Sequence, residues 1–306
     1  MREITLLLPF ALPPAEHAKD LIAALEAPAL ARLLSRGSEL PGIEFEPFSA
    51  SLPHEALLAG TTGDNSPPAA HALMRELGLP ETGAYWFVLQ PAHFHVARDH
   101  LVLTDLRQLA LDETESRTLF DAALPLFQEL GHDLRYGDAR RWFLRADDWQ
   151  GLRTTTPDAA TGHNIDVWLP SGERARDWRK LHNEVQMLWH MHPLNDEREM
   201  RGEARVNALW LWGGASPALA PVSARPLPQV DESLVSHALA GDWGRWLVAM
   251  NEVERTQIAP LLAALASGEI ARLSLQLTDA TRIRSWRATR AGMRKFWVKP
   301  SLSRLR

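Results

Sequence analysis

Short apolar runs alternate with longer amphipathic stretches along most of the chain. Apolar runs that are bounded by Gly, Pro or Asn predict strands over residues 4–8, 86–89, 101–103, 141–145, 165–169, 208–212 and 270–277. Apolar residues at helical spacing predict helices over residues 15–35, 69–77, 113–130, 173–191, 234–239 and 243–266. Because strands and helices alternate, the pattern predicts an α/β fold with a mostly parallel or mixed central sheet and helices on both faces.

The 306 residues fit two domains or one large domain. We expect residues 1–214 to form an α/β domain. The segment 215–230 is rich in Pro, Ala and Ser, which is typical of a linker. Residues 231–306 then supply helices, a strand and a basic tail that complete the fold.

Composition narrows the class of protein. Hydrophobic residues make up 45% and charged residues 23% of the chain, which is globular composition. The absence of Cys excludes disulfides and thiolate chemistry and favours a reducing, cytoplasmic setting. The apolar run at the N-terminus is short and contains Glu3, so it predicts a strand rather than a signal peptide, and no run is long enough to cross a membrane. The 12 Trp residues predict a Trp-rich core, and the net charge of −5 argues against binding nucleic acid over the whole surface.

The most informative stretch is residues 183–214. On the preceding helix, Trp178, Leu181, Val185, Leu188 and His192 share an apolar stripe. Asn183, Gln186 and His190 share a second stripe, which is polar. One face of the helix therefore packs, while the other carries amides and an imidazole. Trp210 and Trp212 then lie on one face of a strand, before Gly213 and Gly214.

A resemblance to known families rests on this order of residues. A Pro-Gly turn, a helix, His192-Pro193-Leu194-Asn195, Arg198 and Asn207-Ala208-Leu209-Trp210-Leu211-Trp212-Gly213-Gly214 follow one another. Over residues 150–215 the chain resembles the archaeal-type, cofactor-independent phosphoglycerate mutases of the alkaline-phosphatase superfamily. Over most of its length it is similar to a bacterial family of phosphoglycerate-mutase-like, pathogenicity-factor regulatory proteins. Further matches to that family are Pro91-Ala92-His93, Arg98-Asp99-His100-Leu101, Gly268 with the strand after it, and Phe296-Trp297.

The resemblance implies a distantly alkaline-phosphatase-like fold and, for a mutase, two divalent metals held by Asp and His beside a Ser or Thr nucleophile. Three departures make that site improbable in this chain. The first strand ends in Pro9-Phe10 where the mutases have Asp, and Thr156-Pro157-Asp158 lacks a His. The late Asp-His pair is also missing. We therefore expect no metal and no cofactor, with Mn²⁺ or Mg²⁺ required only if the protein is an enzyme.

The leading hypothesis is a catalytically divergent scaffold that acts as a regulatory or interaction protein with a protein partner. Its candidate polar network comprises Asn183, Gln186, His190, Asn195, Arg198 and Asn207. The alternative is a metal-dependent phosphoglycerate mutase or phosphohydrolase, whose pocket would bring His93 and Asp158 together with His190. His93 and His95 alternate on a strand, but ordinary packing is the more frequent explanation for such a pair.

A third hypothesis comes from the basic C-terminal segment. Its candidate phosphate or nucleic-acid contacts are Arg282, Arg284, Arg287, Arg290, Arg294 and Lys295. Trp286, Phe296 and Trp297 are interleaved with them, and cations with aromatics suit phosphate contact and base stacking. The competing interpretation is a solvated edge whose aromatic side chains pack into the core.

Overall fold

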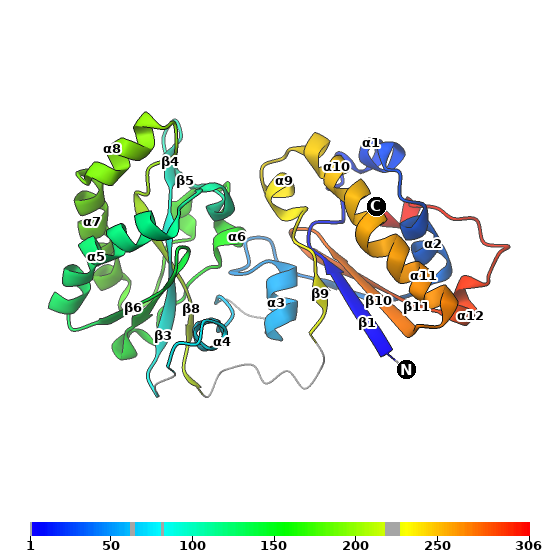
Figure 1. Ribbon diagram of the computed structural model, residues 1–306, viewed down its shortest axis with the longest axis horizontal. Helices are drawn as coiled ribbons and strands as arrows, with labels where there is room; N and C mark the ends of the chain where they lie inside the picture. Colours follow the sequence, from blue (N-terminus) through cyan, green and yellow to red (C-terminus); the bar gives the residue numbers. More distant parts are fainter. Residues whose placement is uncertain (1, 62–64, 81–82, 218–226) are drawn as a thin grey trace. The chain divides into compact units, whose positions relative to one another are not determined.

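The chain forms two compact units (Figure 1). The computed structural model describes residues 2–61, 65–80, 83–217 and 227–306. Unit 1 contains residues 2–47, 53–58 and 227–306, and unit 2 contains 48–52 and the described residues from 59 to 217. This division differs from the predicted boundary at 214, because the first strand pairs with a strand of the C-terminal segment. Most of the predicted linker lies outside the described residues, and its ends belong to strands.

The described residues of unit 1 contain a mixed five-stranded sheet. Its strands, in spatial order, are β2 (Ser38–Glu44), β11 (Arg282–Thr289), β10 (Ile270–Thr278), β1 (Arg2–Leu8) and β9 (Gln229–Val230). β1 runs parallel to both β10 and β9, whereas β10, β11 and β2 pair in antiparallel fashion. The prediction of a mixed sheet is confirmed in this unit.

Helices α2 and α11 of unit 1 pack on strands β11 and β10 of its sheet (Figure 1). The helices are α1 (Ala18–Ala24), α2 (Pro28–Arg36), α3 (Pro53–Ala59), α9 (Val235–Leu239), α10 (Trp243–Val253), α11 (Ala259–Ser267) and α12 (Arg290–Met293). The single helix predicted over 15–35 is two helices, because Pro28 starts a new one. A short π-helix, Glu254–Ile258, joins α10 to α11 just before Pro260, which has no N–H to continue the regular ladder.

Strand β11 corrects the prediction of a basic tail. It lies inside the sheet between β10 and β2, and it buries Ile283, Trp286 and Ala288. The register shifts between Ile283 and Ser285, so the buried positions do not alternate strictly along the sequence. The register shift and the many Arg residues interrupt the alternation of apolar and polar residues that predicts a strand, so the sequence pattern did not indicate β11.

Unit 2 is built on an antiparallel sheet of four strands among its described residues. The order is β6 (Asp133–Asp138), β7 (Arg141–Arg145), β3 (Trp86–Ala92) and β8 (Ala208–Ala215), with a separate hairpin of β4 (Phe94–Val96) and β5 (Leu101–Leu103). Its helices are α4 (Ala70–Glu76), α5 (Glu113–Glu129), α6 (Pro157–Ala160), α7 (Ala175–His190) and α8 (Pro193–Met200). The strand predicted over 165–169 is wrong, since Ile165–Val167 is a short 3-10 helix.

Both faces of the unit 2 sheet are covered. On β3, Trp86 and Val88 belong to a cluster with Ala70 and Met74 of α4. The alternate residues Phe87 and Leu89 belong to a larger cluster with side chains of α5 and α7. The predicted helices on both faces are therefore confirmed here, and most of the Trp residues are buried as predicted.

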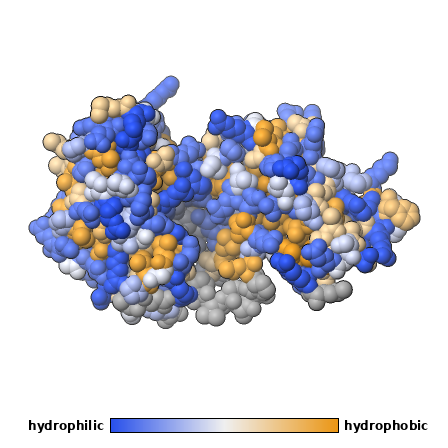
Figure 2. Space-filling view, in the orientation of Figure 1, coloured by the Kyte–Doolittle hydropathy of each residue, from blue (hydrophilic) through white to orange (hydrophobic). Residues whose placement is uncertain are grey.

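The face drawn in Figure 2 is mostly hydrophilic, with separate hydrophobic areas over both units. No helix in the described ranges combines the length and apolar character that crossing a bilayer requires. The exposed aromatics include Phe296 and Trp297, whose side chains are 82% and 70% exposed.

The role of β11 as an inner strand can be tested with two Trp substitutions. Trp286 is 1% exposed, so Trp286→Ala should lower the free energy of unfolding of unit 1 by about 3–5 kcal/mol. Trp297→Ala is the matched control and should change it by less than about 0.5 kcal/mol. Urea denaturation with hydrogen exchange of the β10 and β11 amides measures both. Equal effects of the two substitutions would contradict an inner position for β11.

Candidate functional site

The candidate site is the segment formed by α7, α8 and β8 of unit 2. The apolar stripe of α7 is confirmed for Trp178, Leu181 and Val185. It then passes through Trp189 rather than the predicted Leu188, which is partly exposed. α7 thus packs on the sheet of unit 2 and carries polar residues at its edges.

Asn195 connects the end of α7 to the segment before β8. Its side chain is fully buried, and Nδ2 donates to the carbonyls of Trp189 at 2.8 Å and Val206 at 2.9 Å. The N–H of Val206 donates back to Oδ1 at 2.8 Å. The amide therefore satisfies backbone groups on both elements, as a buried Asn must.

Arg198 is a fully buried cation in α8. Nε donates to the carbonyl of Ala204 at 2.9 Å and Nη2 to that of Leu109 at 2.6 Å. Nη1 forms an ion pair with Glu115 in the first turn of α5, and Glu115 also pairs with Arg201. A buried guanidinium requires such a partner, so this set of bonds fixes α8 against α5.

Asn207, just before β8, bonds to the β4–β5 hairpin, and Gln186 joins α7 to the same residue. The N–H of Phe94 donates to Oδ1 of Asn207 at 2.7 Å, and Nδ2 of Asn207 donates to the carbonyl of Phe94 at 2.9 Å. Nε2 of Gln186 donates to the carbonyl of Asn207 at 3.1 Å. Next to them, Nδ1 of His93 lies 2.8 Å from the carbonyl of Arg205, and burial lowers the pKa of His93.

The predicted network is only partly assembled. The side chains of Gln186, Asn195, Arg198 and Asn207 all bond to other elements of unit 2, whereas Asn183 and His190 have exposed side chains on α7. The prediction that Asn183 and His190 belong to a buried network is therefore wrong. Both side chains are exposed, whereas Trp178 and Trp189 on the same helix are buried in the core.

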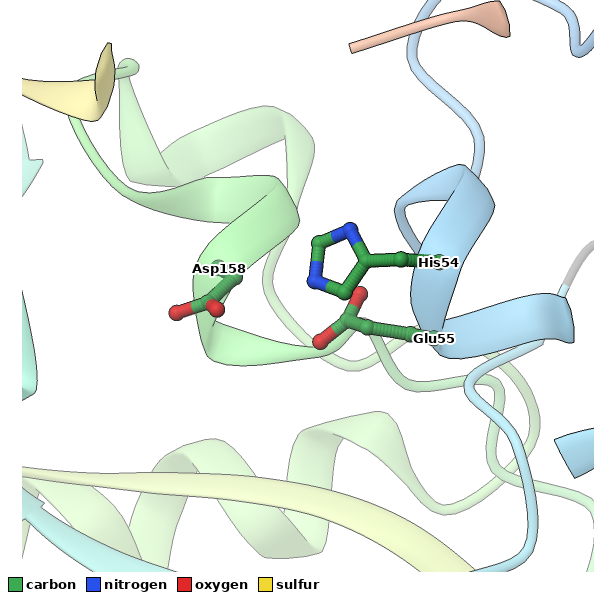
Figure 3. Close-up of side chains that lie close together, drawn as sticks. All are labelled: His54, Glu55 and Asp158. Carbon is green, nitrogen blue, oxygen red and sulfur yellow. The ribbon is translucent and has the colours of Figure 1, made fainter. Parts of the chain in front are cut away.

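Asp158 lies on α6 and forms an ion pair with Arg107, a residue that was not predicted to belong to a site. Oδ1 accepts from Nη1 and Nη2 of Arg107 at 2.8 and 2.9 Å. His93 bonds to the carbonyl of Arg205 instead, so Asp158 and His93 have different partners. Figure 3 shows Asp158 leaving α6, while His54 and Glu55, also drawn there, belong to α3.

His182 is a buried residue that sequence reasoning missed. Its ring packs against Trp178 and Phe94, with centroids 5.4 and 5.7 Å apart, and its Nε2 accepts from the N–H of Leu209 at 3.3 Å. Burial lowers the pKa of His182 to about 4. Its spacing of four residues from Trp178 on the packing face was the available signal.

The six predicted cationic contacts do not share one environment. Arg282 pairs with Asp279, and Arg284 pairs with Glu39 and donates to the carbonyls of Arg304 and Arg306. Arg287, Arg290 and Arg294 are exposed, and Lys295 is half-buried. Because Trp286 is buried, its ring is not available to stack on a base.

Comparison with known proteins places these features in context. No protein-family profile matches the chain. The 2,3-bisphosphoglycerate-independent phosphoglycerate mutase of Methanosarcina barkeri is 30% identical over 132 residues, which is 41% of this chain and 32% of the relative. The enzyme of the same description from Methanosarcina mazei is 27% identical over 123 residues, covering 39% and 30%. The chain is distantly homologous to the cofactor-independent phosphoglycerate mutases. The matches span about a third of the length of these curated relatives.

Two solved structures are similar at low scores. The cofactor-independent phosphoglycerate mutase from Thermoplasma acidophilum aligns with a TM-score of 0.39 and 14% identity, over 99% of this chain and 94% of that one. The PH0037 protein from Pyrococcus horikoshii aligns with a TM-score of 0.44 and 12% identity, over 94% and 87%.

The buried ion pair of the site predicts a large stability effect. Arg198→Ala should destabilise unit 2 by about 3–5 kcal/mol, because it leaves the carboxylate of Glu115 without its buried partner. Arg205 pairs with the exposed Asp196 and Glu199, so Arg205→Ala should cost at most about 1 kcal/mol. Chemical denaturation of both variants measures the difference. A loss as small as that of the control would refute the structural role of Arg198.

His182 predicts a dependence of stability on pH. Its pKa in the folded state is about 4, below the ordinary value of 6.5, so the unfolded chain binds the proton more readily. Its contribution is complete above pH 6.5 and is lost as the pH falls toward 4, by about 3 kcal/mol in all. His182→Gln keeps an acceptor for Leu209 and should flatten this part of the stability profile. Denaturation at pH 7, 6, 5 and 4 measures both proteins. If the variant and the unchanged chain lose stability identically as the pH falls, His182 is not the source of the pH dependence.

Proposed function

We propose that the chain is a catalytically divergent member of the phosphoglycerate-mutase-like scaffold and acts as a regulatory or interaction protein. The distant homology to the mutases supports the scaffold. The absence of Cys fits the expected cytoplasmic setting. Membership of a bacterial family of pathogenicity-factor regulatory proteins, which the order of residues in the sequence suggests, is part of this proposal.

The observation that carries the proposal is how the polar residues of the mutase-like segment are used. The side-chain donors of Asn195 and Asn207 go to backbone carbonyls, and their oxygens accept backbone N–H groups. Arg198 is likewise occupied by carbonyls and by Glu115. Groups that are engaged in this way hold elements together and have little capacity left to bind a phosphate.

The residues present do not fit the two-metal site that the resemblance implies. Phe10 follows the first strand where the mutases have a carboxylate; its side chain is apolar and buried, and its carbonyl accepts from Nε1 of Trp246 at 2.8 Å. Asp158 is paired with Arg107, and a neighbouring cation disfavours a second one. No metal-dependent step is therefore assigned to the chain.

An exposed aromatic pair supports the interaction role. The rings of Phe296 and Trp297 contact each other at a centroid distance of 5.2 Å, and both side chains are mostly exposed. Large exposed aromatics mark contact surfaces in soluble proteins. Lys295 and Lys299 flank the pair, so this surface is also where the nucleic-acid alternative would place its contacts.

A mutase assay tests the loss of catalysis. The purified chain with Mn²⁺ or Mg²⁺ should not interconvert 3- and 2-phosphoglycerate above the rate without protein, whereas the Methanosarcina barkeri relative serves as the active reference. If the chain does show turnover, and if Asp158→Asn abolishes it while the exposed control Asp121→Asn does not, the enzyme alternative replaces the proposal.

Partner recovery tests the interaction role. Trp297→Ser should reduce the recovery of a protein partner, whereas Val248→Ser, at another exposed position, should not.

A further inference from the structure

Unit 1 contains a cavity of about 400 Å³ that is separate from the candidate site formed by α7, α8 and β8 in unit 2. It lies beyond the carboxyl ends of the parallel strands β1 and β10, where the chain continues as Phe10 to Ala15 and Asp279 to Arg282. In open α/β sheets the carboxyl ends of parallel strands are the usual place for a ligand. The volume is within the range of small-molecule sites, which starts at about 300 Å³.

The backbone at this cavity is strained. Phe10 has a φ of 57°, which is unfavourable for a bulky side chain. The surrounding structure imposes it: the N–H of Phe10 donates to Oγ1 of Thr278 at 3.3 Å, and its carbonyl accepts from Nε1 of Trp246 at 2.8 Å. The N–H of Leu12 also donates to the carbonyl of Thr278, at 3.0 Å. Strain of about 1–3 kcal/mol persists only when neighbours fix the conformation, and such residues gather at functional sites.

The cavity wall is largely apolar and partly aromatic. Phe10 and Trp243 supply rings, and Leu12, Pro14, Ala15 and Ala238 supply aliphatic surface. Trp243 is the first residue of α10 and is half-buried. A wall of this composition favours a flat, apolar ligand over a sugar phosphate.

The described lining has two charged residues, Asp279 and Arg282. Oδ1 of Asp279 accepts from the N–H groups of Thr281 and Arg282 at 2.8 and 2.7 Å, and Oδ2 accepts from Nε of Arg282 at 2.7 Å. The carboxylate is thus saturated with donors. Nε and Nη2 of Arg282 both pair with Asp279, and Nη1 makes no hydrogen bond to any described residue, so the pair offers a ligand a donor rather than an acceptor.

We propose that this cavity binds a small aromatic carboxylate, with its ring against Phe10 and Trp243 and its carboxylate on Nη1 of Arg282. A charged acceptor on a guanidinium forms the stronger kind of hydrogen bond, and the rings bury the apolar part of the ligand. The site goes beyond the proposed function, and its test does not depend on whether the chain has mutase activity.

Calorimetric titration of the full chain with naphthalene-2-carboxylate and its neutral amide tests the proposal. The acid should bind at least about tenfold more tightly than the amide, as expected when a charged hydrogen bond is lost. Trp243→Ala should weaken both ligands by about tenfold, and Arg282→Gln should reduce the acid to the affinity of the amide. Arg282→Lys should restore part of the preference for the acid.

Two controls separate this cavity from the rest of unit 1. Trp297→Ala removes an exposed Trp, and Arg287→Gln removes an exposed cation of the same strand as Arg282; neither should change binding. Circular dichroism confirms that each variant is folded, and Trp243→Leu replaces Trp243→Ala if the latter unfolds. Equal affinity for acid and amide, no binding at millimolar concentration, or binding that Trp243 and Arg282 substitutions leave unchanged would overturn the proposal.

Discussion

The parallel pairing of β1 with β10 is the constraint on which unit 1 depends. It joins the first strand of the chain to a strand that begins at Ile270, and it buries Leu6, Leu7 and Leu8 in the same step. The loops that follow the two strands are thereby brought to one edge of the sheet. Thr278 at the end of β10 then binds the backbone of Phe10 and Leu12, so the pairing also shapes the cavity at that edge.

In unit 2 the corresponding constraint is the satisfaction of buried polar groups. Asn195 and Arg198 are fully buried, and each must find partners for all its donors. The partners are mostly carbonyls of irregular segments, such as Ala204, Val206 and Leu109. The His-Pro-x-Asn motif and the Arg after it therefore act as a brace for segments that no sheet ladder stabilises. The polar side chains of this motif therefore have a structural role in unit 2.

The sequence was informative wherever the local pattern alone determines structure. The predicted helices over 113–130 and 173–191 and the strands at β1, β3, β5, β7, β8 and β10 agree closely with the structure. Pattern reasoning failed at β11, where Arg residues and a bulge disguise an inner strand, and at α1 and α2, where Pro28 divides a continuous helical periodicity.

The candidate site was only partly predictable. The amide and guanidinium side chains could be identified from their positions, but their partners could not. Glu115 and Arg107 are ordinary surface types in the sequence, and only the tertiary fold brings them to Arg198 and Asp158. His182 was overlooked because a single His on a packing face resembles any other core residue in a pattern.

The interrupted course of unit 1 has a consequence for synthesis on the ribosome. Residues 2–47 emerge before unit 2, but β10 and β11 follow only after the whole of unit 2 has been made. Unit 2 forms from nearly continuous chain and can fold while translation proceeds, whereas β1 must wait with three adjacent Leu residues uncovered. The nascent chain therefore exposes an apolar edge until β10 has been made, and chaperone binding or slow translation would act during that interval.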